Sequence, residues 1–337
     1  MRRRAAIAGS LLALAGTILP PVSHPQAHPA STSATSDYVA DGRAPLDHLA
    51  RRFAELDAKH GWPVETVYTY PDAPDLQIKA WRTPAAGPAL WVLAGIHGEE
   101  PAGPNAIARE LDALAAFARS GVPVVVLPLC NPRAYRHNWR YPNTAERDWK
   151  KGGGYSVGDA EYLLPHLEHG HAPRAARVSG PETYALTQFV LRLAERYPPR
   201  LVLDLHEDEL STEGGYIYSQ GRQADANPVG AEIVRLLQAS GIPLRRSGET
   251  RFGETIVDGV ISRDDQGGPI RDGSIDELLA SPEVFVEDRK VRGPSADTVI
   301  VVETPAFAGA RFDQRVAAQS AVVRAVADLW RLNASLR

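Results

Sequence analysis

The chain has 337 residues, of which 44% are hydrophobic and 23% are charged. This balance is ordinary for a folded protein and excludes a fibrous repeat or a wholly disordered chain. A formal net charge of −4 excludes a nucleic-acid binder that depends on a broad basic face. The single cysteine, Cys130, excludes an internal disulfide and a cysteine-based zinc cluster. Any metal site must therefore use histidine and carboxylate ligands.

The first residues have the features of a secretory signal. Three arginines at positions 2–4 precede an apolar run over 5–19, which is too short for a helix that spans a membrane. We expect a signal peptide over 1–30, with an uncleaved N-terminal anchor as the alternative. The mature protein would be periplasmic or extracellular and have no transmembrane segment. Residues 31–41 predict a flexible linker, and residues 42–337 form the predicted functional domain.

The domain alternates segments typical of buried strands with segments typical of amphipathic helices. The short apolar runs that predict strands buried on both faces are 90–95, 123–129, 201–205 and 298–302. The helix candidates are 104–120, 181–197, 228–240 and 313–332. This alternation predicts an α/β fold: a single three-layer domain with a mixed, largely parallel sheet between helices. The stretches 131–177 and 250–291 stay unassigned, and loops of that length are usually functional or mobile.

Polar residues stand at the end of each predicted strand, where ligands gather in open α/β sheets. In chain order these segments are Gly95-Ile96-His97-Gly98-Glu99-Glu100, Asn131-Pro132-Arg133-Ala134, Asp204-Leu205-His206-Glu207-Asp208 and Glu303-Thr304-Pro305. Four strand ends thus carry two histidines, several carboxylates and the start of an arginine cluster, which is the distribution expected of a catalytic site.

These residue types and spacings indicate a zinc hydrolase. His97 and Glu100, three residues apart on a turn, can direct a nitrogen and a carboxylate at one ion, and His206 would supply the third ligand. Three protein ligands leave one position of a tetrahedral zinc ion open for water, whose pKa the ion lowers to about 7. Glu303 suits the role of the general base. Asp204 shares a strand face with His206 and could orient its imidazole.

A fixed cation beside the metal would stabilise the oxyanion that forms during hydrolysis. Arg140 is the best placed candidate, and Arg133, Arg136 and Arg147 stay open as alternatives.

Two further groups of ionisable residues receive other interpretations. Glu207 and Asp208 are expected to orient side chains or to solvate a loop rather than to bind zinc. His166, His169 and His171 lie in a polar stretch without flanking strands, which favours an exposed loop over a second metal site.

The motifs His97-x-x-Glu100, Asn131-Pro132, Asp204-Leu205-His206 and Glu303-Thr304-Pro305 occur in the order of the zinc carboxypeptidase superfamily. The chain resembles a bacterial member of it over about residues 89–307. The segment Asn131-Pro132-Arg133-Ala134 with the later Arg140-Tyr141 is similar to the aspartoacylase and succinylglutamate desuccinylase branch. The Glu-Thr-Pro ending instead resembles bacterial murein-peptide amidases and carboxypeptidases.

The resemblance implies one zinc ion bound by His97, Glu100 and His206. It further implies a general base and acid at Glu303 and an oxyanion arginine at Arg140.

Contacts to the substrate are also implied, and here the chain departs from the family pattern. The family usually has an adjacent Asn-Arg pair that binds the substrate carboxylate, but the corresponding stretch, 143–148, contains none. Arg147 and Arg133 are the candidates for that contact. A substrate-capping tyrosine is implied as well, and Tyr218 is the candidate, in a segment with Tyr216 that predicts a strand beside the site.

The leading hypothesis is an exported zinc-dependent carboxypeptidase or amidase that hydrolyses an amide bond of a peptide, with peptidoglycan stem peptides as candidate substrates. An N-acyl-amino-acid deacylase is the rival, although export counts against it because such substrates are cytoplasmic metabolites. A zinc-containing envelope protein that only binds ligands is the third hypothesis. Glu303 argues against it, since a structural zinc ion needs no spare base. No nucleic-acid partner is expected, and the oligomeric state stays open.

Overall fold

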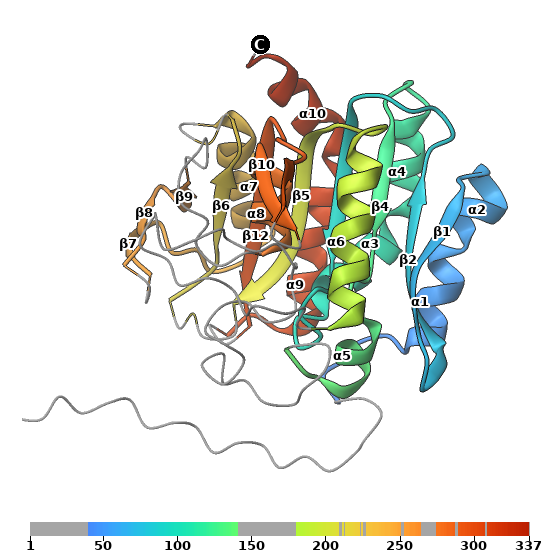
Figure 1. Ribbon diagram of the computed structural model, residues 1–337. Helices are drawn as coiled ribbons and strands as arrows, with labels where there is room; N and C mark the ends of the chain where they lie inside the picture. Colours follow the sequence, from blue (N-terminus) through green and yellow to red (C-terminus); the bar gives the residue numbers. More distant parts are fainter. Residues whose placement is uncertain are drawn as a thin grey trace, which may run out of the picture. The chain divides into compact units, whose positions relative to one another are not determined.

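A ten-stranded mixed sheet is the frame of the domain (Figure 1). The computed structural model describes residues 40–140, 180–208, 211, 213–222, 224, 227–250, 253–263, 274–286, 289–306 and 309–336. The predicted signal peptide, all but the last two residues of the predicted linker, Arg147 and the histidines at 166, 169 and 171 lie outside these residues. In the part that is described, no helix combines the length and apolarity needed to cross a bilayer.

The strands of the large sheet follow the order β1-β2-β4-β3-β5-β12-β6-β9-β8-β7. Their bounds are β1 Val64–Tyr70, β2 Ala73–Arg82, β3 Ala89–Ala94, β4 Val124–Leu127, β5 Pro199–Asp208, β6 Tyr216–Gln220, β7 Ser247–Glu249, β8 Thr255–Val257, β9 Val260–Ser262 and β12 Thr298–Pro305. The four central strands β4, β3, β5 and β12 are mutually parallel, whereas β2 and β6 join them antiparallel on either side. A separate two-stranded sheet pairs β10 (Glu283–Val286) with β11 (Arg289–Arg292). The predicted mixed sheet with a parallel centre is confirmed.

The central strands form because their apolar runs are covered on both faces. Every residue of β3 and β4 is buried, as expected for strands inside a parallel sheet. β5 and β12 pair from Thr298↔Leu201 to Pro305↔Asp208 and so extend past the apolar runs predicted from sequence. His206 and Glu303 therefore stand opposite each other inside two paired strands and not in the loops that follow them.

Helices cover both faces of the sheet (Figure 1). Their bounds are α1 Leu46–Phe53, α2 Glu55–His60, α3 Ala102–Arg109, α4 Leu111–Ala118, α5 Pro132–His137, α6 Pro181–Ala194, α7 Pro228–Ala239, α8 Ile275–Ala280, α9 Phe312–Arg324 and α10 Val326–Ala334. Residues of α3, α4, α7, α9 and α10 share one core with Leu203, Leu205 and Val302. Residues of α6 and α8 share the other core with Val202 and Val299. The sheet thus lies between two helical layers, as predicted.

Several elements differ from the prediction. The single helices expected over 104–120 and 313–332 are each two helices, broken at Glu110 and at Ala325. The buried Glu110 forms an ion pair with Arg324 of α9, a contact between helices that local sequence does not encode. The unassigned stretch 250–291 contains β8, β9, α8, β10 and the start of β11, and the β1–β2 hairpin has no counterpart in the predicted elements.

Candidate metal centre

The first two candidate ligands lie on the turn that follows β3. The chain leaves the strand at Gly95, where φ is +65° and a Cβ atom would stand 2.7 Å from Leu129 and 2.8 Å from Pro104. A hydrogen bond from the Glu100 amide to the His97 carbonyl (3.3 Å) closes the turn. The turn brings Nδ1 of His97 to 2.8 Å from Oε1 of Glu100.

His206 approaches the same carboxylate from β5. Its Nδ1 lies 2.9 Å from Oε2 of Glu100, and its Nε2 lies 3.3 Å from Oδ1 of Asp204. Asp204 thus lies within ion-pair distance of the His206 imidazole, on the strand face that the sequence predicts, although no hydrogen bond joins the two side chains. The rings of His97 and His206 are 5.1 Å apart between centroids, so the two imidazoles flank the Glu100 carboxylate from two sides.

These three residues fit the requirements of a zinc site. One donor atom from each of His97, Glu100 and His206 lies within 4.8 Å of the others, and all three side chains are buried. Two imidazole nitrogens and one carboxylate oxygen form a common ligand set of catalytic zinc. Because the donor atoms converge from a turn and a separate strand, the set is fixed by the fold and not by one flexible loop.

The electrostatics of the three residues favour a positive charge where their donor atoms meet. Burial opposes ionisation of Glu100, but the two imidazoles outweigh it and hold the pKa of this carboxyl well below its usual range. Burial also disfavours a charged His206, yet the carboxylates of Asp204 and Glu100 outweigh it and raise the pKa of this imidazole. A divalent cation would satisfy the same charge distribution.

Glu303 lies beside the candidate ligands but forms no ion pair with any described residue. In the ladder it stands between His206 of β5 and Tyr216 of β6. Among the described residues its partly buried carboxylate makes no hydrogen bond or ion pair. Burial raises its pKa to about 8; the imidazole of His206 opposes this shift, and the carboxylates of Glu100 and Asp208 add to it. A carboxylate with a raised pKa and a free edge has the properties of a general base.

Of the candidate arginines that the structure describes, Arg140 contacts one of the candidate metal ligands, Glu100. Its Nη1 lies 2.9 Å from Oε1 of Glu100 and 3.2 Å from Oε1 of Glu99. Arg133 instead pairs with Asp72 and stacks over the Tyr70 ring, 4.3 Å from its centroid.

Arg136, which also belongs to α5, pairs with Asp75 of β2 at 2.6 Å. The structure therefore brings Arg140 to the ligand set, and it ties Arg133 and Arg136 to the β1–β2 hairpin.

The tyrosines of β6 lie on the same sheet face as Glu303. Tyr216 donates a hydrogen bond to Oδ2 of Asp208 (2.8 Å). Tyr218, the predicted substrate contact, donates to Oε2 of Glu254 (2.9 Å), and the Arg263 guanidinium stacks 4.2 Å from the centroid of its ring. Burial raises the pKa of both tyrosines, so both hydroxyls stay protonated at any ordinary pH.

Supporting contacts reach the metal centre from the opposite face of the sheet. Gln319 of α9 donates through Nε2 to the carbonyl of His206 and to Oγ1 of Thr304, both at 2.8 Å. This one amide therefore joins the strand that carries His206 to the strand that carries Glu303. No motif in the sequence marks Gln319, because its contacts are to backbone and hydroxyl groups far along the chain.

Glu207 and Asn131 have supporting roles as well. Oε2 of Glu207 accepts a hydrogen bond from the Ala102 amide at the start of α3 (2.7 Å), and its other oxygen pairs with Arg315. Asn131 caps α5 by accepting from the Ala134 amide and donates to the Ile96 carbonyl in the metal-binding turn. An Asn directly before Pro132 is a recognisable start signal for a helix, so this role could have been read from the sequence. Glu207 orients other groups, as expected.

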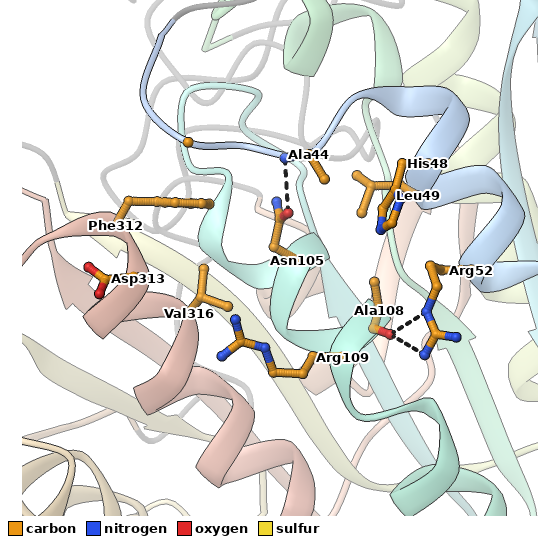
Figure 2. A pocket seen from close by; sticks show the side chains of 11 residues that line it. Ala44, His48, Leu49, Arg52, Asn105, Ala108, Arg109, Phe312, Asp313 and Val316 are labelled. Atoms are coloured by element: carbon orange, nitrogen blue, oxygen red, sulfur yellow. Dashed lines mark hydrogen bonds between the residues drawn. The ribbon is translucent and has the colours of Figure 1, made fainter.

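A pocket of about 540 Å³ lies between α1, α3 and α9, away from these residues (Figure 2). Its lining residues are Gly42, Ala44, His48, Leu49, Arg52, Asn105, Ala108, Arg109, Phe312, Asp313 and Val316. None of the candidate ligands lines it. The chemistry of the buried donor set, and not the size of this pocket, locates the candidate site.

No family model matches the sequence. A search of curated proteins finds no relative. The fold, in contrast, matches solved structures over most of its length. The crystal structure of a candidate metallopeptidase from Shewanella baltica has 23% identity, with a TM-score of 0.61, 87% of this chain covered and 92% of that chain. A second candidate metallopeptidase, from Shewanella denitrificans, has 20% identity and a TM-score of 0.60, covering 86% of this chain and 96% of that one.

Carboxypeptidase A from Helicoverpa armigera is similar at lower identity. It has 13% identity and a TM-score of 0.53, with 91% of this chain and 78% of that chain covered. At these identities the likeness concerns the fold alone. The chain therefore has the fold of metallopeptidases and carboxypeptidases, which confirms the zinc-carboxypeptidase-like fold that its motifs predict.

Proposed function

We propose that the protein is a zinc-dependent peptidase of the carboxypeptidase or amidase type, which hydrolyses an amide bond of a peptide. One observation carries the proposal: His97, Glu100 and His206 converge with donor atoms within 4.8 Å, and the unpaired edge of Glu303 lies directly beside them. A set of three protein ligands with a spare carboxylate is typical of catalytic zinc, whereas structural zinc normally has four protein ligands.

Each component of the site has a separate role in amide hydrolysis. Zn²⁺, when bound, supplies a positive charge that polarises a substrate carbonyl and makes water more acidic. Glu303 takes the proton of the attacking water and later donates it to the leaving nitrogen. In the metal-free protein its pKa is about 8, and a cation at the ligands would lower that value towards neutrality. A group with a pKa near the working pH can both accept and release a proton.

Arg140 provides the second positive charge. Its side chain is 31% exposed and its Nη1 lies next to Glu100, so the guanidinium borders the ligand set without being enclosed by it. From there it can stabilise the negative charge that develops on the substrate carbonyl oxygen. Asp204 holds the imidazole of His206 in the orientation that directs Nδ1 at the ligand set.

The location and the substrate class extend this proposal. The basic and apolar N-terminal sequence supports export, which would bring the enzyme to the periplasm or the extracellular space. Stem peptides of peptidoglycan are abundant amide substrates there, and we propose them as the first class to test. The assignment of substrate contacts to Tyr218, Arg133 and Arg147 is part of the same proposal. It requires that Tyr218 exchange Glu254, and Arg133 exchange Asp72, for the substrate.

The test combines metal analysis with a substrate panel. The purified protein is expected to contain close to one zinc ion per chain, and His206→Ala, which removes one of three ligands, is expected to lose both zinc and hydrolytic activity. Full zinc occupancy in His206→Ala would refute the ligand assignment. The panel compares stem peptides and ordinary peptides with N-acetyl and N-succinyl amino acids.

Each result of the panel distinguishes between functions. Turnover of peptides supports the proposal. Preference for acylated amino acids would reverse it in favour of the deacylase that the segment Asn131-Pro132-Arg133-Ala134 suggests. Binding of peptides without hydrolysis, unchanged in Glu303→Gln, would favour an envelope binding protein.

A further inference from the structure

The N-terminal segment of the described chain delivers one buried guanidinium to the region of the metal centre. Arg43 lies just past the predicted linker, and its side chain is 1% exposed. Its Nη1 donates to the carbonyls of Gly98 (2.8 Å) and Tyr135 (2.6 Å), and its Nη2 donates to Oδ1 of Asn138 (2.6 Å). Asp41 neutralises the charge at 2.7 Å. Three acceptors that are 55 to 95 residues away in sequence thus share one side chain.

Two of these acceptors belong to segments that already touch. Gly98 is the residue between His97 and Glu99 in the metal-binding turn, and a Cβ atom on it would stand only 1.9 Å from the carbonyl carbon of Ala134 in α5. The turn and the helix therefore meet backbone to backbone. Arg43 bonds one carbonyl on each side of this contact, so its guanidinium fastens the turn to the helix.

The third acceptor, Asn138, connects Arg43 to Arg140, the candidate for stabilising the oxyanion. Asn138 ends α5 in the left-handed conformation, with φ of 55°. Two residues later comes Arg140, whose Nη1 returns to Oε1 of Glu100 at 2.9 Å. Arg43, the turn, Arg140 and Asn138 thus form a closed ring of contacts around the side of the site that faces α5.

The backbone beside Arg43 is itself anchored. The Ala44 amide donates to Oδ1 of Asn105 (3.1 Å), and the Tyr135 hydroxyl donates to the Ala44 carbonyl (2.8 Å) (Figure 2 shows the first contact). At Gly42, with φ of +94°, a Cβ atom would stand 2.9 Å from the Phe312 ring. These contacts hold the segment above α3 and leave little freedom for the Arg43 side chain to leave its acceptors.

We infer that Arg43 is a positioning residue for the metal centre, which holds the His97–Glu100 turn and the end of α5 at the distance that lets Glu100 and Arg140 meet. The inference rests on the proposed metal site. It assigns to the N-terminal segment, which the sequence presents as the end of a linker, a part in setting the affinity for the metal. Removal of the guanidinium would take a buried donor from both of its carbonyl acceptors, Gly98 and Tyr135.

The test measures Zn²⁺ affinity in competition with a chromophoric chelator, for the wild type and for Arg43→Ala. Arg52→Ala is the matched control. Arg52 also ties the N-terminal region to α3, through the Ala108 carbonyl at 3.1 Å and 3.3 Å, but it makes no contact with the metal-binding turn. The melting temperature of each metal-free variant and the visible absorption of each Co²⁺ form are recorded in parallel.

We expect Arg43→Ala to bind Zn²⁺ roughly 10-fold or more weakly and to change the Co²⁺ spectrum, as loss of an outer-shell partner does at other sites. Arg52→Ala should keep both. Equal affinity in Arg43→Ala and the wild type, or an equal loss in both variants, would overturn the inference. If Arg43→Ala does not fold, Arg43→Lys replaces it, because a single ammonium cannot reproduce the three-acceptor fork; wild-type affinity in Arg43→Lys would then overturn the inference.

Failure of the proposed function gives a different result. A wild-type protein that binds no Zn²⁺ in a defined ratio removes the metal site altogether. A wild-type protein that binds one ion, together with an Arg43→Ala variant that binds it equally well, removes only the role of Arg43.

Discussion

Two glutamates on neighbouring parts of the sheet differ in how their charge is compensated. Glu254, which precedes β8, is closed in by Arg263 at 3.0 Å from its Nε, by the Tyr218 hydroxyl at 2.9 Å and by the Thr250 hydroxyl at 3.2 Å. Glu303 in β12 has no such partners among the residues described, and its pKa rises to about 8 as a result of its burial.

Under the proposed function, the difference separates a structural carboxylate, Glu254, from the proposed reactive one, Glu303. The Glu254 carboxylate accepts four hydrogen bonds, two of them from the Arg263 guanidinium, and so has no free lone pairs to offer a substrate or a water molecule. A carboxylate kept among other acids without a cation of its own is poised to take a proton. The two residues therefore form a natural pair for testing which part of the sheet carries the chemistry.

The largest effect is expected from Glu303→Gln. This change keeps the size of the side chain but removes the base, so turnover of a peptide substrate should fall by roughly 10²- to 10⁴-fold. Zinc content should stay at the wild-type level, because Glu303 is not among the three ligands. Steady-state kinetics and metal analysis of the same preparation measure both quantities.

Glu254→Gln is the control for that measurement. The amide oxygen can replace only one of the two carboxylate oxygens, so this variant keeps either the bonds from Arg263 or those from Tyr218 and Thr250. Because Glu254 is not one of the candidate metal ligands, we still expect a far smaller change in turnover than in Glu303→Gln. Comparable losses in the two variants would contradict the distinction between the two glutamates.

A smaller loss is expected from Arg140→Ala. Removal of a group that stabilises the developing oxyanion should raise the activation free energy by about 3 kcal/mol, which lowers turnover roughly 100-fold. Zinc should stay bound. The matched control is Arg136→Ala, because the Arg136 guanidinium pairs with Asp75 of β2. If Arg136→Ala or Arg133→Ala lowers turnover and Arg140→Ala does not, the role belongs to another arginine of the cluster.

A further effect, on folding rather than on turnover, concerns the stability of the metal-free protein as a function of pH. Folding raises the pKa of Glu303 from 4.5 to about 8, so between these values the folded state retains a proton that the unfolded state has lost. Stability must therefore fall as the pH rises through this window, and it is unaffected by this group below it. Glu303→Gln lacks the titration, so relative to the wild type it should gain stability between pH 5 and pH 8.

Urea unfolding in the presence of a chelator, at a series of pH values, measures this difference. Parallel curves for the two proteins would mean that Glu303 titrates alike in the folded and unfolded states, and the raised pKa would be refuted.

The centre of the fold could be predicted from sequence for a physical reason. β3, β4, β5 and β12 are buried on both faces, so their sequences are almost continuously apolar and any polar residue at their ends stands out. His97, Glu100, His206 and Glu303 were visible against that background, and the structure brings them together.

Contacts between distant segments were not predictable in the same way. At the break between α3 and α4, Glu110 pairs with Arg324, more than 200 residues away. Arg43 lies just past the predicted linker, where the sequence shows no motif. Its acceptors are two main-chain carbonyls and one side-chain amide oxygen, and no sequence pattern marks such contacts. The outer strand of the hairpin, β1, has no strict alternation of polar and apolar residues and is exposed or half-buried at every position but the last. Its pattern is therefore weaker than that of the buried strands.

The amide of Gln319 links the thermal stability of the candidate site to one helix, α9. Because Nε2 of this side chain holds both the His206 carbonyl and the Thr304 hydroxyl, detachment of α9 from the sheet would release the two strand ends in a single event. Loss of activity on heating should then coincide with the release of α9, well before the parallel strands themselves separate.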